Sequence, residues 1–90
     1  MVGTNQKVEK KEISVNPNPA SSYFFINMSS FNRDELLRVL VADETGKLVY
    51  AEKTDLSSLF VNTSGWTPGL YHIKVVGKNQ EANQKILVIE

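Results

Sequence analysis

The sequence predicts an all-β fold, an immunoglobulin-like, seven-stranded antiparallel β-sandwich. Two observations lead to this prediction. From Glu12 onward, apolar and polar residues alternate with a period of two, as in strands that bury one face. Turn signals interrupt the alternation about every eight to twelve residues, the spacing that a sandwich or a barrel produces. A small Greek-key barrel is the main alternative fold.

The length and composition fit one small globular domain. The chain has 90 residues, of which 41% are hydrophobic and 22% are charged, close to the averages for globular proteins. A chain of this size buries only about 60–65% of the surface that its unfolded form exposes. The core therefore leaves no room for a deep, walled active site.

The first residues differ from the rest of the chain. Residues 1–11 (MVGTNQKVEKK) are polar and show no periodicity, which is typical of a linker or tail. We therefore expect residues 1–12 to be a flexible linker or an expression-derived tail, and residues 13–90 to form the folded domain.

Two strands separated by a proline-rich crossing follow. The first places Ile13 and Val15 on one face, and Asn-Pro-Asn-Pro at 16–19 ends it, because proline has no N–H to donate. The second strand covers 23–28 and is largely apolar on both faces. We expect the tail or loops to cover part of its second face. The core face carries Phe24, Ile26 and Met28. The second face carries Tyr23, Phe25 and Asn27.

A hairpin forms the middle of the chain. The third strand, 36–42, faces the core with Leu37, Val39 and Val41. Residues 43–46 (DETG) predict its turn, since aspartate caps such a turn and Gly46 accepts the positive φ that closes it. The fourth strand returns over 47–53.

Residues 54–60 (TDLSSLF) fit either a loop with a helical turn or a short edge strand. A fifth strand covers 60–63. In the turn that follows, at 64–69, we expect Trp66 to pack over one end of the core.

The closing part predicts two more strands. The sixth, 70–76, turns Tyr71, Ile73 and Val75 inward. A turn at 77–80 leads to the last strand at 85–89. A terminal strand of this kind can leave its edge open to an added strand from a partner.

The residue inventory excludes most kinds of catalytic site. The chain has no cysteine, and its one histidine, His72, is expected on the solvent side of a strand. No serine lies in a nucleophile-elbow pattern, and no glycine-rich phosphate loop is present. The acidic pairs at 34–35 and 43–44 lack the ligand spacing of a calcium loop. We therefore expect no enzymatic activity, no cofactor and no bound metal.

Charge and hydropathy exclude two classes of partner. Ten Lys and Arg residues balance ten Asp and Glu residues, whereas a nucleic-acid-binding domain carries a basic excess on one face. No apolar run approaches the ~20 residues that span a bilayer. Residues 1–12 also lack the apolar segment of a signal peptide. We therefore expect neither nucleic-acid binding nor membrane insertion, and any export signal would lie elsewhere in a parent protein.

Three motifs, taken together and in order, resemble a known family. These are SVNPNPASSYFFI near the start, VLVADETGKLVY in the middle and VNTSGWTPGLYHIKVVGKNQEANQKILVIE at the end. They are similar to the Pro-Asn-Pro opening, the Asp-x-x-Gly hairpin, and the Gly-x-Tyr strand with its lysine-bearing terminal strand of the type A C-terminal sorting domain of the type IX secretion system. One departure is Trp-Thr-Pro at 66–68, where the family more often has Leu-Pro-Ala.

The resemblance implies a sorting signal of Bacteroidetes that directs a larger cargo protein across the outer membrane. The implied partners are the type IX translocon, a sortase and the N-terminal cargo domains of the same polypeptide. The implied route runs through the periplasm to the cell surface or the extracellular space. A sortase would cleave within or upstream of residues 1–12 and attach the cargo to the surface.

The resemblance also singles out candidate recognition residues. The terminal strand is the strongest candidate for direct contact with the translocon. The full set is Pro17, Asn18, Pro19, Gly46, Gly69, Tyr71, Lys85, Leu87, Val88 and Ile89.

A fibronectin-like spacer or a carbohydrate-binding accessory module of a secreted enzyme is the alternative function. Its aromatic candidates are Tyr23, Tyr50, Trp66 and Tyr71. We expect Trp66 and Tyr71 to fill the core instead, because both fall on inward or turn-packing positions.

Overall fold

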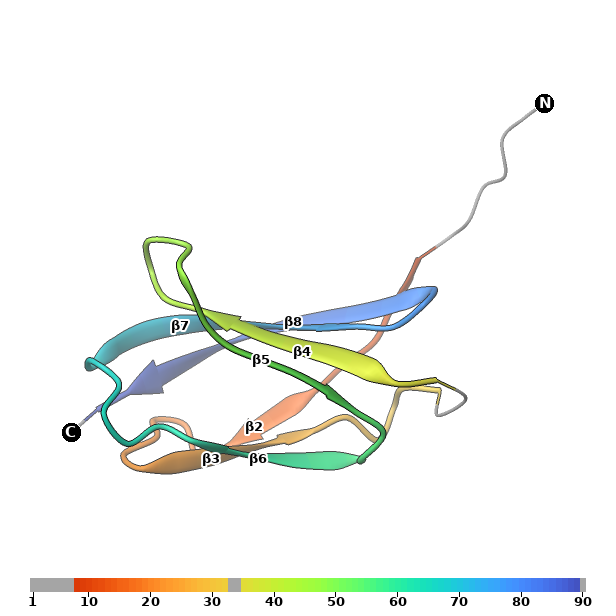
Figure 1. Cartoon of the computed structure of the whole chain (residues 1–90). Coiled ribbons are helices and arrows are strands. Elements are labelled where there is room, and N and C mark those ends of the chain that lie inside the picture. Colours follow the sequence, from red (N-terminus) through yellow and green to blue (C-terminus); the bar gives the residue numbers. More distant parts are fainter. Residues whose placement is uncertain (1–7, 33–34, 90) are drawn as a thin grey trace.

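The chain folds into two β-sheets packed face to face, and the computed structural model describes residues 8–32 and 35–89 (Figure 1). The five-stranded sheet has the order β1-β8-β7-β4-β5, and the three-stranded sheet has the order β2-β3-β6. The predicted all-β sandwich is confirmed, with eight strands rather than seven. In chain order the strands are β1 (Glu9–Lys10), β2 (Ser14–Asn16), β3 (Tyr23–Asn27), β4 (Leu37–Ala42), β5 (Leu48–Thr54), β6 (Ser58–Asn62), β7 (Gly69–Val76) and β8 (Gln80–Val88).

The alternation in the sequence becomes the division between core and solvent. Every second side chain of β3, β4, β6 and β7 is buried, and these side chains meet between the two sheets. The predicted core residues on β3, β4 and β7 are confirmed. The fully buried hydrophobic side chains include Phe24, Ile26, Met28, Leu37, Val39, Val41, Val61, Ile73, Val75 and Ile86.

The outer face of β3 differs from the prediction. Tyr23 and Phe25 are exposed, and no described segment covers them. Their rings contact each other and Phe60 of the neighbouring strand. The expectation that a loop covers this face was therefore wrong, because the aromatic side chains shelter one another across the strand pair, and the tail at 1–7 lies outside the described residues.

The hairpin between β4 and β5 forms as predicted. Gly46 has a φ of +90°, and the Asp43 N–H donates to the carbonyl of Lys47 at 2.9 Å. The Asp43 Oδ1 accepts from the N–H groups of Thr45 and Lys47 and from the Thr45 hydroxyl, at 2.9, 3.0 and 2.7 Å. These hydrogen bonds, that of the Thr45 hydroxyl first, lower the pKa of Asp43 from its ordinary value. The carboxylate thus holds the turn.

The connection after β5 leads directly into an edge strand. This strand is the one predicted at 60–63: β6 starts at Ser58, ends at Asn62 and lies at the edge of the three-stranded sheet, and residues 54–60 form neither a helical turn nor a separate edge strand. Its five residues pair with the whole of β3.

The last strand is longer than predicted. β8 starts at Gln80 instead of residue 85 and pairs in register with β7, from Gly69 opposite Val88 to Val76 opposite Glu81. The polar residues at 83–85 are all exposed and break the alternation of buried and exposed side chains, so the sequence pattern did not predict the first half of the strand. Backbone pairing with β7 holds it in the sheet nonetheless. The buried Gln80 amide is satisfied by the backbone of Asn32, with N–H···Oε1 at 2.9 Å.

The segment expected to be a tail also contributes. β1 runs parallel to the start of β8, with Glu9 opposite Gln80 and Lys10 opposite Glu81. An ion pair of 3.3 Å between Lys10 and Glu81 accompanies the pairing. The sheet therefore begins before residue 13. Residues 1–7, Arg33, Asp34 and Glu90 lie outside the described residues. The prediction of a flexible tail at 1–7 and the prediction for one member of the acidic pair at 34–35 therefore also lie outside them.

Candidate recognition surface

The opening and closing motifs of the chain are joined directly. The backbone of Ala20 forms a parallel bridge with β8, in which its N–H donates to the Leu87 carbonyl at 2.8 Å and its carbonyl accepts from Ile89 at 2.7 Å. Next to this bridge, the Asn18 Oδ1 accepts a hydrogen bond from the Leu87 N–H at 3.1 Å. The Asn18 side chain also makes a longer contact of 3.4 Å with the Lys85 carbonyl. Residues 18–20 thus act as a short extra strand beside β8.

The alternation of proline and asparagine explains why a side chain takes part. Pro17 and Pro19 have no N–H to donate to a neighbouring strand, and the peptide bonds before both are cis. The Asn18 amide carries a donor and an acceptor, and it supplies both to β8. The motif therefore covers the strand edge without a regular strand.

This cover changes the prediction for the terminal strand. The edge of β8 was expected to be open to an added strand, and over 85–89 that expectation was wrong. β1 covers the start of the edge, and Asn18 and Ala20 cover its end. The Lys85 N–H between them is taken by the Oε1 of Gln84 at 3.0 Å.

The Gly-x-Tyr motif lies on the other side of the same strand. Gly69 pairs with Val88, and Tyr71 pairs with Ile86. The Tyr71 ring is buried, and its hydroxyl donates to the Thr67 carbonyl at 2.6 Å. Burial, and next the negative charges at 43 and 44, raise the pKa of this phenol. Tyr71 is therefore a neutral structural anchor for the turn before β7.

The aromatic residues near this turn belong to the core, as predicted. The ring centroid of Trp66 lies 5.0 Å from that of Tyr71 and 6.2 Å from that of Phe24. Trp66 is half-buried against the core and caps this end of the sandwich. It is not part of an open stacking platform.

The β4–β5 hairpin comes close to the same end. An open groove of about 550 Å³ separates it from the turn before β7, with Glu44 and Lys47 on one wall and Trp66 and Gly69 on the other. A Cβ atom on Gly69 would lie 3.9 Å from the Glu44 carboxylate. The hairpin closed by Gly46 is thereby placed beside the Gly-x-Tyr motif.

The structure therefore gathers the candidate residues at one end of the molecule (Figure 1). This end carries the hairpin, the turn before β7 and the end of β8, whereas residues 8–11 lie at the opposite end. Tyr71 and Val88 are buried and can serve only the fold. Six residues that are at least partly accessible form what we call the terminal surface: Pro17, Asn18, Pro19, Lys85, Leu87 and Ile89.

The sequence analysis missed Ala20. Its side chain is fully buried, and its backbone makes the two hydrogen bonds to β8. The signal available in the sequence was a small residue directly after the second proline, where the backbone approaches a neighbouring strand closely.

No chemical centre accompanies these residues in the described part of the chain. Residues 8–32 and 35–89 contain no group of three or more acidic or histidine side chains that could hold a metal ion. His72 is exposed on β7. No helix long and apolar enough to cross a membrane occurs among the same residues.

A solved structure has the same fold as this chain. The solved structure of PorZ from Porphyromonas gingivalis, described as an essential bacterial surface component of the type-IX secretion system, is similar in fold, with a TM-score of 0.72 at 20% identity. The match covers 87% of this chain and 11% of PorZ, so the chain spans about a tenth of that protein. Curated proteins gave no match.

A family model gives the identity. The model for the secretion system C-terminal sorting domain matches residues 14–90, nearly the whole described domain. This family is not an enzymatic one. The chain therefore belongs to the family of C-terminal sorting domains that direct proteins to type IX secretion.

Proposed function

We propose that this domain is the sorting label of a longer cargo polypeptide and that the type IX translocon reads it through the terminal surface. The observation that carries the proposal is the contact of Asn18 and Ala20 with β8. It makes one continuous surface of two motifs that stand at opposite ends of the domain sequence. A constant surface of this kind suits a label that one receptor must recognise on many cargoes.

The accessible side chains of the surface support direct contact. Leu87 on β8 and Ile89 just after the strand are both exposed, beside the opening motif that Asn18 and Ala20 join to this end of the chain. Burial of these apolar side chains against a partner would be favourable, and a preorganised backbone beside them lowers the entropic cost of binding. The position of residues 8–11 at the other end of the sandwich leaves this surface clear of a cargo domain that precedes the label.

The remaining steps follow the family. The label travels through the periplasm with its folded cargo and passes the outer membrane. A sortase then cleaves upstream of the sandwich and attaches the cargo to the cell surface. The domain itself performs no catalysis in this scheme.

A secretion assay tests the proposal. Residues 1–90 are fused to the C-terminus of an exported reporter in a type IX-competent bacterium, and reporter in the medium and on the surface is compared with reporter in the periplasm. We expect secretion of the wild-type fusion. Replacement of both apolar side chains (Leu87→Thr/Ile89→Thr) should lower it at least about tenfold, equivalent to about 1.4 kcal/mol of binding energy.

The matched control removes two exposed leucines at the opposite end of the sandwich, Leu36→Thr/Leu56→Thr. This variant should be secreted like the wild type. A wild-type fusion that stays in the periplasm while native cargo is secreted would contradict the sorting function. Equal secretion of both double variants would contradict the terminal surface alone.

A further inference from the structure

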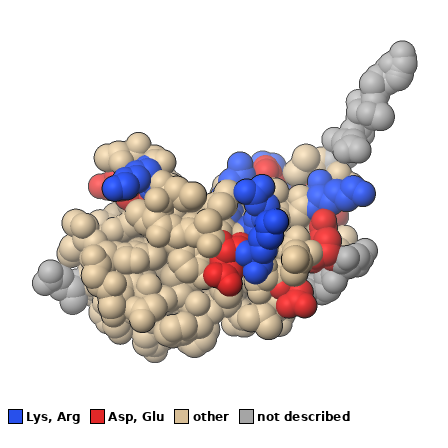
Figure 2. Space-filling model, viewed as in Figure 1, with Lys and Arg blue, Asp and Glu red and all other residues tan. Residues whose placement is uncertain are grey.

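The three-stranded sheet carries no charge. The strands β2, β3 and β6 read SVN, YFFIN and SLFVN, without a lysine, arginine, aspartate or glutamate. The strands of the other sheet carry Glu9, Lys10, Arg38, Glu52, Lys53, Lys74, Glu81 and Lys85. Figure 2 shows the charged side chains gathered over that sheet and the loops, while the lower left of the molecule is uncharged.

The strand register arranges the outward side chains of this sheet in a grid. In the middle row, Asn16, Phe25 and Phe60 stand side by side across the three strands. Tyr23 stands beside Asn62 in the row on one side. Ser14, Asn27 and Ser58 form the row on the other side. We call these eight residues the neutral face.

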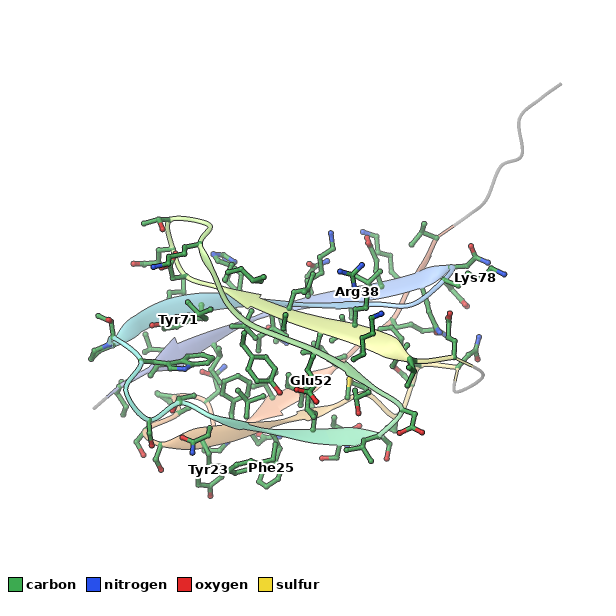
Figure 3. The ribbon with its side chains drawn as sticks, in the orientation of Figure 1. Tyr23, Phe25, Arg38, Glu52, Tyr71 and Lys78 are labelled. Carbon is green, nitrogen blue, oxygen red and sulfur yellow. The ribbon has the colours of Figure 1, made fainter. Side chains whose placement is uncertain are left out.

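The aromatic side chains of the neutral face are both exposed and fixed. Tyr23, Phe25 and Phe60 are 40%, 43% and 51% exposed. Their ring centroids lie only 5.4–5.7 Å apart, and each ring contacts the other two. Figure 3 shows Tyr23 and Phe25 pointing away from the core. A ligand would therefore meet a preformed apolar cluster, with little side-chain entropy left to lose.

The polar residues around the rings offer oriented hydrogen-bonding groups. The Asn27 Oδ1 accepts from the Ser29 N–H at 2.9 Å, and the Asn62 Oδ1 accepts from the Ser64 N–H at 2.8 Å. These bonds fix both side chains and leave their NH2 groups to donate outward. Within the described residues, the Asn16 side chain makes no hydrogen bond, so its donor and acceptor are both available.

The neutral face has neither charged nor aliphatic side chains, and this absence limits the chemical class of ligand that it can bind. A charged ligand would lose its hydration here without gaining an opposite charge, which is costly. The outward positions of these strands also hold no aliphatic side chain and no arginine, whereas the centre of a protein interface is typically enriched in arginine and methionine as well as aromatic residues. Exposed aromatic rings offer an apolar packing surface, and the amides and hydroxyls around them offer oriented donors and acceptors, which together match a ligand that has both C–H faces and hydroxyl groups.

We propose that the neutral face binds an uncharged carbohydrate. The rings would pack against the apolar C–H faces of the sugar, and the amides of Asn16, Asn27 and Asn62 would bind its hydroxyl groups. This site lies on the opposite sheet from Leu87 and Ile89 and does not depend on the proposed sorting function.

Chemical-shift mapping tests the proposal without any variant. The uniformly 15N-labelled chain is titrated with neutral hexasaccharides of glucose, mannose and N-acetylglucosamine and, separately, with acidic hexasaccharides of galacturonate. We expect shifts confined to the amides of β2, β3 and β6 with at least one neutral sugar and none with the acidic one. Absence of shifts with every neutral sugar, shifts on the five-stranded sheet, or a preference for the acidic sugar would overturn the proposal.

A variant then tests the rings. Tyr23→Thr/Phe60→Thr keeps β-forming residues at both positions and should weaken sugar binding at least about tenfold, since the ring contacts are lost. The control Leu48→Thr/Val49→Thr removes two apolar side chains of similar exposure, 53% and 37%, from β5 of the other sheet and should bind normally. Equal weakening in both would overturn the site.

The secretion assay, applied to the ring variant Tyr23→Thr/Phe60→Thr, distinguishes a carbohydrate site from a surface that contacts the translocon. A ring variant that loses sugar binding but is secreted normally fits a carbohydrate site distinct from the sorting surface. A wild-type chain that binds no sugar while the ring variant loses secretion would show that this face contacts a protein of the translocon, which overturns the carbohydrate proposal.

Discussion

The two sheets of this small sandwich share one core, but their solvent-facing surfaces differ in chemical character. The five-stranded sheet carries the charged strand residues, the hairpin held by Asp43 and the joined ends of the domain. The three-stranded sheet carries none of these charges and exposes an aromatic cluster instead. A solvated surface explains the first sheet. The second exposes rings where charges would be expected, which indicates a face with a separate role.

The first prediction tests whether both sheets depend on the core that they share. Phe24 is fully buried on β3 and packs edge-to-face on Trp66, which precedes β7 of the other sheet. Phe24→Ala should lower the free energy of unfolding by about 3–5 kcal/mol, because it leaves a cavity between the layers. Denaturant unfolding measures the loss. A change below about 1 kcal/mol would mean that the sheets do not depend on this contact.

The second prediction breaks the link between the sheets. The segment after β2 crosses to β8 through Asn18, so Asn18→Ala should cost about 0.5–1.5 kcal/mol and leave the Leu87 amide without its acceptor. Hydrogen exchange should become faster at Leu87. Asn83→Ala, on an exposed part of the same strand, is the matched control and should change stability by less than about 0.5 kcal/mol. Unchanged exchange at Leu87 in the Asn18 variant would contradict the link.

The third prediction sharpens the contrast between core and neutral face. Each aromatic pair across β3 and β6 stabilises the sheet by about 0.2–1 kcal/mol, far less than a buried ring does. Phe60→Thr removes two such pairs, with Tyr23 and with Phe25, and should therefore lower the free energy of unfolding by at most about 2 kcal/mol in thermal or denaturant scans. A loss as large as that of Phe24→Ala would show that the neutral face is structural.

The smallest effect concerns charge on the five-stranded side. Because the folded-state pKa of Asp43 is lowered, its stabilisation of the hairpin is present above the ordinary value of 3.8 and is lost as the pH falls through the folded-state pKa. Asp43→Asn should be less stable than the wild type at pH 7, and the difference should vanish at low pH. Thermal unfolding against pH measures it. A difference that grows on acidification would contradict the role of the carboxylate.

Much of the fold could be predicted because alternation encodes burial directly. The core sides of β3, β4 and β7 and the hairpin at Gly46 followed from period-two patterns and turn chemistry. The first half of β8 could not be predicted in this way, since its polar residues are held by backbone pairing with β7. The same is true of β1, which is two polar residues long.

The sequence motifs predicted individual residues of the terminal surface but not the contacts that join them. The motifs indicated Asn18, Lys85 and Leu87 separately, yet the hydrogen bonds that join them connect positions 67 and 69 residues apart. Local patterns contain no information on such pairings. The exposure of Tyr23 and Phe25 was missed for a related reason, because an apolar outer face predicts a cover unless the neighbouring strand supplies another ring.

The bridge between Asn18 and Leu87 has a consequence for quality control. A contact between residues so distant in the chain closes a long loop, and this closure carries an entropic cost that the folded domain must offset. A chain in which this loop is open lacks the joined surface, because Asn18 and Ala20 are then not bound to the end of the domain. A receptor that binds it would select finished molecules over unfinished ones and would need no separate test of folding.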